Sequence, residues 1–136
     1  LPPSGHLHSD LKDITGTFMI NGKELIKFRD KINWTFVEVG EDSMMTLEFL
    51  LRGYKNRRSD LFVREVKFWG EGGCSDFRDS DFHYKEHLKL MKKYPEYVYI
   101  KRNVVRKNIG MIADFKYKWN DAYKSSQTAT IIPFYR

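Results

Sequence analysis

The chain has 136 residues, a formal net charge of +6 at pH 7, and 41% hydrophobic and 15% aromatic residues. This length and composition predict one domain with a core large enough to fold without disulfide bridges. The single cysteine, Cys74, excludes an internal disulfide and favours a reducing, intracellular compartment, and the lack of a long apolar run predicts no membrane-spanning helix.

The N-terminal part of the sequence predicts a loose arm followed by a hairpin. Residues 1–10 are rich in Pro, Gly and His and lack hydrophobic periodicity. They are therefore predicted to be a flexible arm, with residues 11–136 as a single β-rich domain. Asn21-Gly22 is a strong short hairpin signal and predicts a hairpin over residues 14–28.

The middle of the chain shows the alternation that is typical of strands. In residues 43–53, apolar side chains recur at every second position from Met45 to Leu51, which predicts a strand with one buried face. Residues 32–38 alternate in the same way, and residues 61–69 are rich in β-branched and aromatic side chains. Three strands are therefore predicted here.

One helix is predicted, over residues 81–94. Tyr84, Leu88 and Met91 recur on one face at helical spacing, and Pro95 ends the segment. Lysines near its C-terminal end complement the helix dipole. The segment therefore differs from its β-rich surroundings.

Three further strands are predicted after this helix, over residues 96–106, 109–119 and 127–135. The last contains Pro133, which indicates an edge strand, and an open edge predicts pairing with another copy of the chain. About seven to eight short strands and one helix near residues 81–94 predict a mainly β or β-rich α+β fold, an antiparallel sandwich or barrel.

Positive charge is concentrated in residues 85–118. This segment holds ten Lys and Arg residues against three acids, a charge of +7, so the rest of the chain carries −1. Such a concentration of cations attracts polyanions or an anionic membrane surface. The predicted anion-binding residues are Arg57, Arg58, Lys101, Arg102, Arg106, Lys107, Lys116 and Lys118. The predicted stacking residues are Tyr97, Tyr99, Tyr117 and Trp119. The alternative is an ordinary solvated sheet face with these aromatic residues in the core.

A second cluster lies in the predicted helix. His83, Glu86 and His87 match the H-x-x-E-H pattern, in which two histidines one helical turn apart bind zinc and the glutamate activates a bound water. A third metal ligand should come from a second helix, and none is evident in the sequence. The favoured interpretation is therefore a helix without a metal, and the metal site is kept as an alternative.

The sequence predicts a binding or structural module rather than an enzyme. It contains no nucleophile elbow, phosphate-binding loop or dinucleotide-binding motif, so no catalytic residue and no cofactor are predicted. The expected partner of the basic C-terminal half is a nucleic-acid backbone or an anionic membrane surface. A small, basic β domain with one cysteine also fits the class of viral coat or matrix proteins. Two alternatives remain open: a metal-dependent hydrolase that uses the H-x-x-E-H segment, and a β-sandwich that binds carbohydrate or protein.

Overall fold

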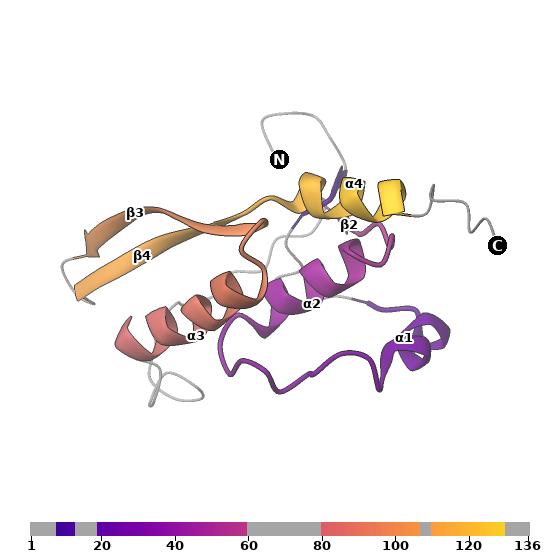
Figure 1. Ribbon diagram of the computed structural model, residues 1–136, viewed down its shortest axis with the longest axis horizontal. Coiled ribbons are helices and arrows are strands. Elements are labelled where there is room, and N and C mark those ends of the chain that lie inside the picture. The colour runs from indigo at the N-terminus through magenta and orange to yellow at the C-terminus, as the bar shows by residue number, and fades with distance from the viewer. Residues whose placement is uncertain (1–7, 13–18, 60–79, 107–109, 130–136) are drawn as a thin grey trace. The chain divides into compact units, whose positions relative to one another are not determined.

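The computed structural model describes residues 8–12, 19–59, 80–106 and 110–129 (Figure 1). In these residues the chain is a mixed α+β protein with four helices and two antiparallel two-stranded sheets. In chain order the elements are β1 (His8–Asp10), α1 (Gly22–Phe28), α2 (Glu41–Leu50), β2 (Arg57–Ser59), α3 (Ser80–Lys93), β3 (Val98–Arg106), β4 (Gly110–Tyr117) and α4 (Trp119–Ala129). The predicted sandwich or barrel of seven to eight strands is therefore wrong.

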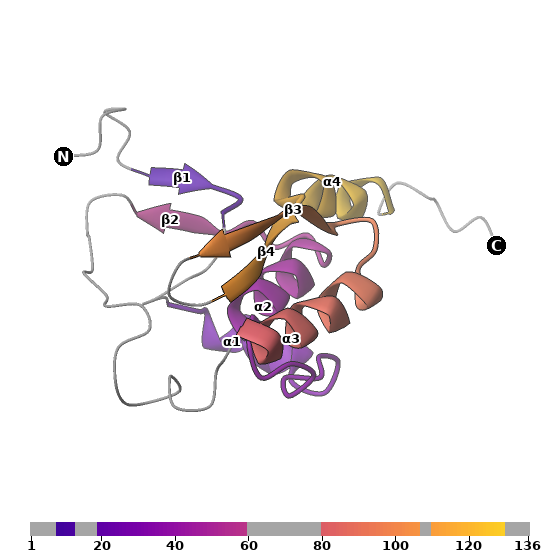
Figure 2. The same cartoon turned by 90° about the vertical axis from the view of Figure 1, so that its left-hand side faces the viewer.

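The described elements belong to two compact units. The first unit contains β1, α1, α2, β2 and α4, and the second contains residues 37–40, α3, β3 and β4. In the first unit β1 pairs with β2, and in the second β3 pairs with β4, both antiparallel (Figure 2). Within the described part of the chain, no helix combines the length and the apolar character that crossing a membrane requires.

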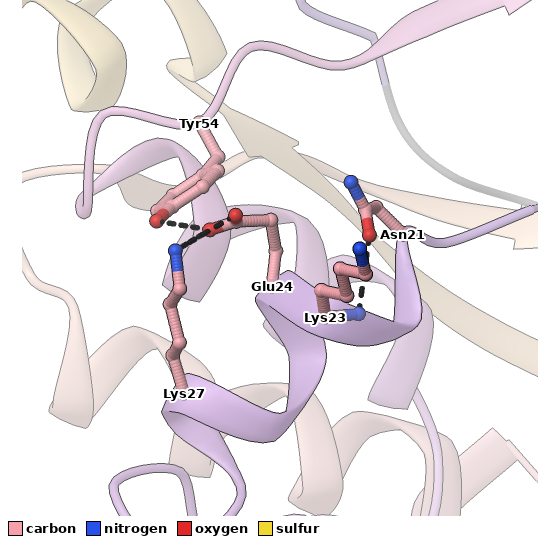
Figure 3. A network of polar contacts seen from close by, with 5 residues as sticks. All are labelled: Asn21, Lys23, Glu24, Lys27 and Tyr54. Carbon is pink, nitrogen blue, oxygen red and sulfur yellow. Dashed lines mark hydrogen bonds and ion pairs between the residues drawn. The ribbon is translucent and has the colours of Figure 1, made fainter.

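Helix α1 begins where the sequence predicts a hairpin turn. The side-chain Oδ1 of Asn21 accepts a hydrogen bond from the backbone N–H of Lys23, 3.1 Å away (Figure 3). An asparagine that satisfies a free backbone N–H at a helix start is an N-cap, and Glu24, three positions later, is the acidic residue typical of the first turn. The hairpin predicted over residues 14–28 is therefore wrong for its second half, because Asn21 caps a helix instead of forming a turn.

Helix α2 replaces the strand predicted over residues 43–53. Met44, Leu47 and Leu50, three residues apart, are almost completely buried, which is the repeat of an apolar helix face. The polar residues between them are buried too, and Glu48 forms an ion pair with an arginine one turn later. Most sides of this helix are buried, so apolar residues also occur at every second position of its sequence. This period of two is the reason for the predicted strand, which is wrong.

Gly53 closes the C-terminal end of α2. Its φ of +83° lies in the left-handed region. Its N–H donates to the Leu50 carbonyl at 3.0 Å, and the N–H of Tyr54 donates to the Phe49 carbonyl at 3.0 Å. This pair of bonds is the Schellman motif, in which a glycine after the last turn satisfies free helix carbonyls. The rings of Tyr54 and Phe49, with centroids 6.3 Å apart, supply the apolar contact that accompanies it.

An aromatic cluster packs α1 against the end of α2. The ring centroid of Phe28 lies 6.2 Å from that of Phe49 and 5.1 Å from that of Tyr54, in edge-to-face geometry, which is favourable for aromatic pairs. The Tyr54 hydroxyl donates to Glu24 Oε2 at 2.7 Å, and the same carboxylate binds Lys27 Nζ at 2.8 Å (Figure 3). The two helices are therefore joined by apolar packing with a polar contact at its rim.

Helix α4 takes the place of the beginning of the last predicted strand. It packs against α2 and buries Ala122 completely. The edge strand predicted over residues 127–135 is wrong for its first three residues, which end α4, and the rest lies outside the described residues. Thr128 favours strands by propensity, but its hydroxyl donates to the Lys124 carbonyl at 3.2 Å, one helical turn back. Thr128 therefore lies in the last turn of α4 despite its strand propensity, with its hydroxyl bonded within the helix.

The other strands predicted in the first half have different outcomes. Residues 32–38 contain turns and no strand: Asn33 Oδ1 accepts from the Thr35 N–H at 3.2 Å, and the Asn33 carbonyl accepts from the Phe36 N–H at 3.2 Å. An asparagine side chain that bonds to the backbone two residues later favours a turn over a sheet ladder. Residues 61–69 lie outside the described residues. The end of the predicted arm forms β1.

The elements predicted for the second unit agree with the structure. The helix predicted over residues 81–94 is confirmed as α3, and the strands predicted over residues 96–106 and 109–119 are confirmed as β3 and β4, apart from their ends. Helix α3 packs along one face of the β3–β4 hairpin (Figure 1). The ring centroids of Phe115 and His87 lie 5.0 Å apart at this contact.

Candidate anion-binding face

The register of the β3–β4 hairpin sorts its side chains onto two faces. Ile100 lies opposite Phe115, and Tyr99 lies opposite Lys116. Directly opposed residues of an antiparallel pair point to the same side, and consecutive residues point to opposite sides. The face of Ile100 and Phe115 is the inner face, because the Phe115 ring contacts α3. Tyr99 and Lys116 therefore lie on the outer face.

A β-bulge changes this alternation at Lys101. Ile100 is paired with Phe115, but the next residue of β4, Asp114, is paired with Arg102 rather than with Lys101. Lys101 is thus the extra residue of the bulge. Without it, Arg102 would share the inner face with Ile100. With it, Arg102 lies on the outer face beside Asp114, and both Lys101 and Arg102 are exposed.

Among the side chains that the structure describes, the outer face carries four cations, one carboxylate and one aromatic ring. Its residues are Tyr99, Lys101, Arg102, Asp114, Lys116 and Lys118, all exposed except Asp114, which is half-buried. Asp114 contacts two of the cations: Oδ1 lies 3.1 Å from Lys116 Nζ, and Oδ2 lies 3.8 Å from Arg102 Nε. Ion pairs of this kind, open to water, are weak. The face therefore keeps an excess of positive charge.

Tyr99 lies among the lysines of the outer face. Its side chain is 42% exposed. Lys116 is its direct cross-strand partner, and Lys118 Nζ lies 5.6 Å from its ring centroid. Lys118 is the diagonal neighbour across the two strands, which is within reach of a cation–π contact. The outer face thus combines an exposed ring with surrounding cations.

Two of the predicted anion-binding residues belong to the first unit. Arg57 and Arg58 lie in β2 and are exposed. Arg57 Nε lies 2.8 Å from Asp10 Oδ1, and Lys55 Nζ lies 2.7 Å from Asp10 Oδ2. These hydrogen bonds, from Arg57 first and Lys55 second, lower the pKa of Asp10 to about 2. Asp10 therefore remains ionised and holds both cations at neutral pH.

The remaining predicted residues are distributed over several places. Tyr117 is half-buried and lies on the inner face, because it shares the strand and side of Phe115. Tyr97, just before β3, and Trp119, the first residue of α4, are half-buried. Lys107 and the side chain of Arg106 lie outside the described structure. Of the four predicted stacking residues, only Tyr99 is exposed.

The H-x-x-E-H segment of α3 takes part in packing. The rings of His83 and His87 stack with centroids 4.1 Å apart and an interplanar angle of 20°, and His87 Nδ1 lies 3.0 Å from the His83 carbonyl oxygen. His87 also packs against Gly40, where an added Cβ would lie 3.1 Å from the imidazole. In the part of the chain that the structure describes, no group of three His, Cys, Asp or Glu side chains is placed to hold a metal ion.

Glu86 points to a different contact from the two histidines. It is only 3% exposed, its Oε2 accepts the Glu38 N–H at 2.9 Å, and its Oε1 lies 2.5 Å from Lys89 Nζ. Burial acts to raise the pKa of Glu86, but the hydrogen bonds from Lys89 and Glu38 outweigh it, so this pKa lies below its ordinary value of 4.5. The ionised carboxylate thus fastens α3 to residues 37–40.

The sequence predicts only part of the outer face. The spacing of Lys116 and Lys118 predicts that they share one side of a strand, and the register places them so. The bulge at Lys101 has no sequence signal, because neither glycine nor proline marks it. The outward placement of Arg102, which depends on the bulge, could therefore not be predicted.

No family model matches the chain, and neither a curated protein nor a solved structure matches it.

Proposed function

We propose that this chain is a non-catalytic binding module that holds an anionic polymer or surface against the outer face of the β3–β4 hairpin. The supporting observation is that four exposed cations and one carboxylate share a single face of two paired strands. Ammonium and guanidinium groups at a surface attract phosphates and other anions, and binding releases the counterions of the polymer. The contact is driven by charge and involves no reaction.

The internal ion pairs leave this charge available to a partner. Arg102 and Lys116 share one carboxylate, and Lys118 contacts the neutral ring of Tyr99. An exposed ion pair contributes at most about 1 kcal/mol. An incoming anion therefore displaces the carboxylate at little cost and gains several cations at once.

Binding to fluorescein-labelled heparin, a polyanion without bases or lipid tails, tests this proposal. We expect the affinity to fall steeply as NaCl rises from about 50 to about 200 mM. The double variant Lys116→Glu, Lys118→Glu should bind about tenfold more weakly or worse, because the charge of the face is reversed at two positions. Fluorescence anisotropy measures both effects.

The matched control is Lys23→Glu, Lys124→Glu. It changes the net charge by the same amount at exposed positions of α1 and α4, in the first unit. We expect it to retain most of the affinity. Equal losses in the two double variants, or an affinity that does not depend on salt, would contradict the proposal.

The two alternatives receive less support from the described residues. The carbohydrate- or protein-binding sandwich depended on a β fold that the structure does not have. The hydrolase requires Glu86 as a base, but one of its oxygens accepts the Glu38 N–H and the other is bound to Lys89. The charged outer face is therefore the stronger basis for a function.

A further inference from the structure

We propose that the partner of the outer face is single-stranded nucleic acid, and that Tyr99 is the platform on which one base stacks while the surrounding cations hold the adjoining phosphates. This inference rests on the proposed function and adds the class of partner. Proteins that bind single strands combine a cationic track with exposed aromatic rings, because every base has a flat face that stacks. A partner without bases would use only the cations.

The position of the Tyr99 ring supports a stacking role. The hairpin has an apolar inner face against α3, yet Tyr99 lies on the opposite face and is 42% exposed. The exposed part of this ring gains further contacts only when another surface covers it. Lys118 Nζ, 5.6 Å from the ring centroid, already marks the ring as a favourable site for a cation–π contact.

The order of the charges along the strands also supports a single-stranded partner. Lys116 lies at the level of Tyr99, and Lys118 lies two residues beyond it, because the Lys118 N–H donates to the Tyr97 carbonyl at 2.9 Å. Arg102, which the bulge places on the outer face, lies on the other side of the ring along β3. A strand that crosses the hairpin lengthwise therefore meets a cation, the ring and another cation in sequence.

A single strand differs from other anionic partners in what it offers to the Tyr99 ring. In a duplex the bases stack on one another, so Tyr99 would find no free base and only the phosphates would bind. A membrane surface can attract the cations, but it offers no flat base that stacks on the exposed ring. Among the strand side chains that the structure describes, the outer face has one exposed aromatic ring and otherwise charged groups. An unpaired strand supplies a base that stacks on the ring and phosphates that contact the cations.

The experiment compares two labelled probes with the same number of phosphates: an oligonucleotide of about 12 thymidines, within the usual site size, and an abasic strand of equal length. We expect the full-length chain to bind the thymidine probe about tenfold more tightly than the abasic probe. In Tyr99→Leu this difference should disappear, with the affinity for the abasic probe unchanged. Tyr99→Phe keeps the ring and should keep the difference.

Further measurements separate this inference from the proposed function. Circular dichroism of each variant confirms that the hairpin is still folded. Equal binding of the two probes by the unaltered chain, or tighter binding to a duplex of equal length or to phosphatidylserine vesicles, would overturn the inference. If Lys116→Glu, Lys118→Glu still abolishes binding in those cases, the polyanion function stands without it. If that double variant binds every probe normally, both proposals are wrong.

Discussion

Asp114 occupies the place on the outer face where a phosphate of a partner would also bind. Its two carboxylate oxygens contact Lys116 at 3.1 Å and Arg102 at 3.8 Å. In the free chain this carboxylate restrains two flexible cations and lowers the charge that they present to solvent. On the proposed function, a bound anion would have to replace this carboxylate, so Asp114 should limit the affinity of the face.

Removing that carboxylate should strengthen binding. We expect Asp114→Asn to raise the affinity for heparin or for an oligonucleotide about fivefold, since an exposed ion pair is worth about 1 kcal/mol or less. Asp121→Asn, which makes the same charge change at an exposed position of α4, is the control and should have a smaller effect. Anisotropy titrations at one salt concentration compare them. A weaker complex for Asp114→Asn would contradict this role.

Gly40 and Gly53 have nearly the same backbone conformation in different surroundings. Their φ angles are +84° and +83°. A Cβ on Gly40 would lie 3.1 Å from the His87 ring and 3.2 Å from Leu90 Cδ1, both in packed side chains. A Cβ on Gly53 would first meet Gln127 Nε2, at 3.3 Å, which is the end of a flexible side chain. An alanine is strained at both glycines, but only at Gly40 are its tight neighbours packed side chains.

Alanine substitutions at the two glycines should therefore differ in cost. We expect Gly53→Ala to lower the free energy of unfolding by about 1–2 kcal/mol, the cost of left-handed backbone for an L-residue. Gly40→Ala should lower it by about 3 kcal/mol, because the His87 ring must also move. Urea denaturation of both variants measures the difference. Equal losses would show that the His87 contact adjusts without strain.

At the scale of elements, a helix or strand could be predicted where apolar and polar residues separate at one period. This holds for α3 and for the β3–β4 hairpin. Even in α3 the buried face differs from the predicted one. Tyr84, which is predicted from the sequence to lie on the buried face, is 36% exposed, and the buried residues are centred on His87 and Leu90. A buried Glu86 beside them is the reason, because a charged residue is counted as exposed when only the sequence is read.

In α2 the residues at the two ends indicate a helix better than the spacing of its apolar residues does. Burial on most sides removes the contrast between faces, so periodicity cannot distinguish a helix from a strand. Glu41 and Asp42 form an acidic first turn, and Gly53 follows the last turn as a C-terminal cap. Asn21 before α1 is a similar case, because the same residue type starts helices and turns.

The contact between α3 and residues 37–40 should weaken in acid. The folded-state pKa of Glu86 lies below 4.5, so its ionised form stabilises the fold fully above that pH and progressively less as the pH falls through the lowered value. We expect Glu86→Gln to reduce the free energy of unfolding by about 1 kcal/mol at pH 7. The difference from the unaltered chain should shrink below pH 4.5.

Thermal or urea unfolding followed from pH 7 to strongly acidic conditions checks this expectation. Glu96→Gln, at an exposed position between α3 and β3, is the control and should leave the stability nearly unchanged at each pH. Asp10 and Glu24 also have lowered pKa values, so total stability falls in acid for several reasons. A difference that stays constant across this range would contradict the assignment to Glu86.

At the scale of the whole molecule, the sequence locates the positive charge but does not say which side it lies on. Four lysines of residues 85–118 lie on α3 and are exposed: Lys85, Lys89, Lys92 and Lys93. Because α3 covers the inner face of the hairpin, these four belong to the opposite side from the outer face. The excess of positive charge is thus divided between the α3 side and the outer face of the hairpin. The strand register, which composition does not reveal, decides which cations of the hairpin lie on the outer face.

The extra residue in β3 also restricts how the hairpin can assemble. A ladder without the bulge would pair Lys101 with Asp114 and turn Arg102 towards Phe115 and α3. There the guanidinium would lose both its contact with water and its ion pair with Asp114, so this register would be strongly disfavoured. The register without the bulge is therefore unfavourable, because it would bury an unpaired charge. Arg102, which we propose to lie next to the ligand, therefore also favours one alignment of the two strands during folding.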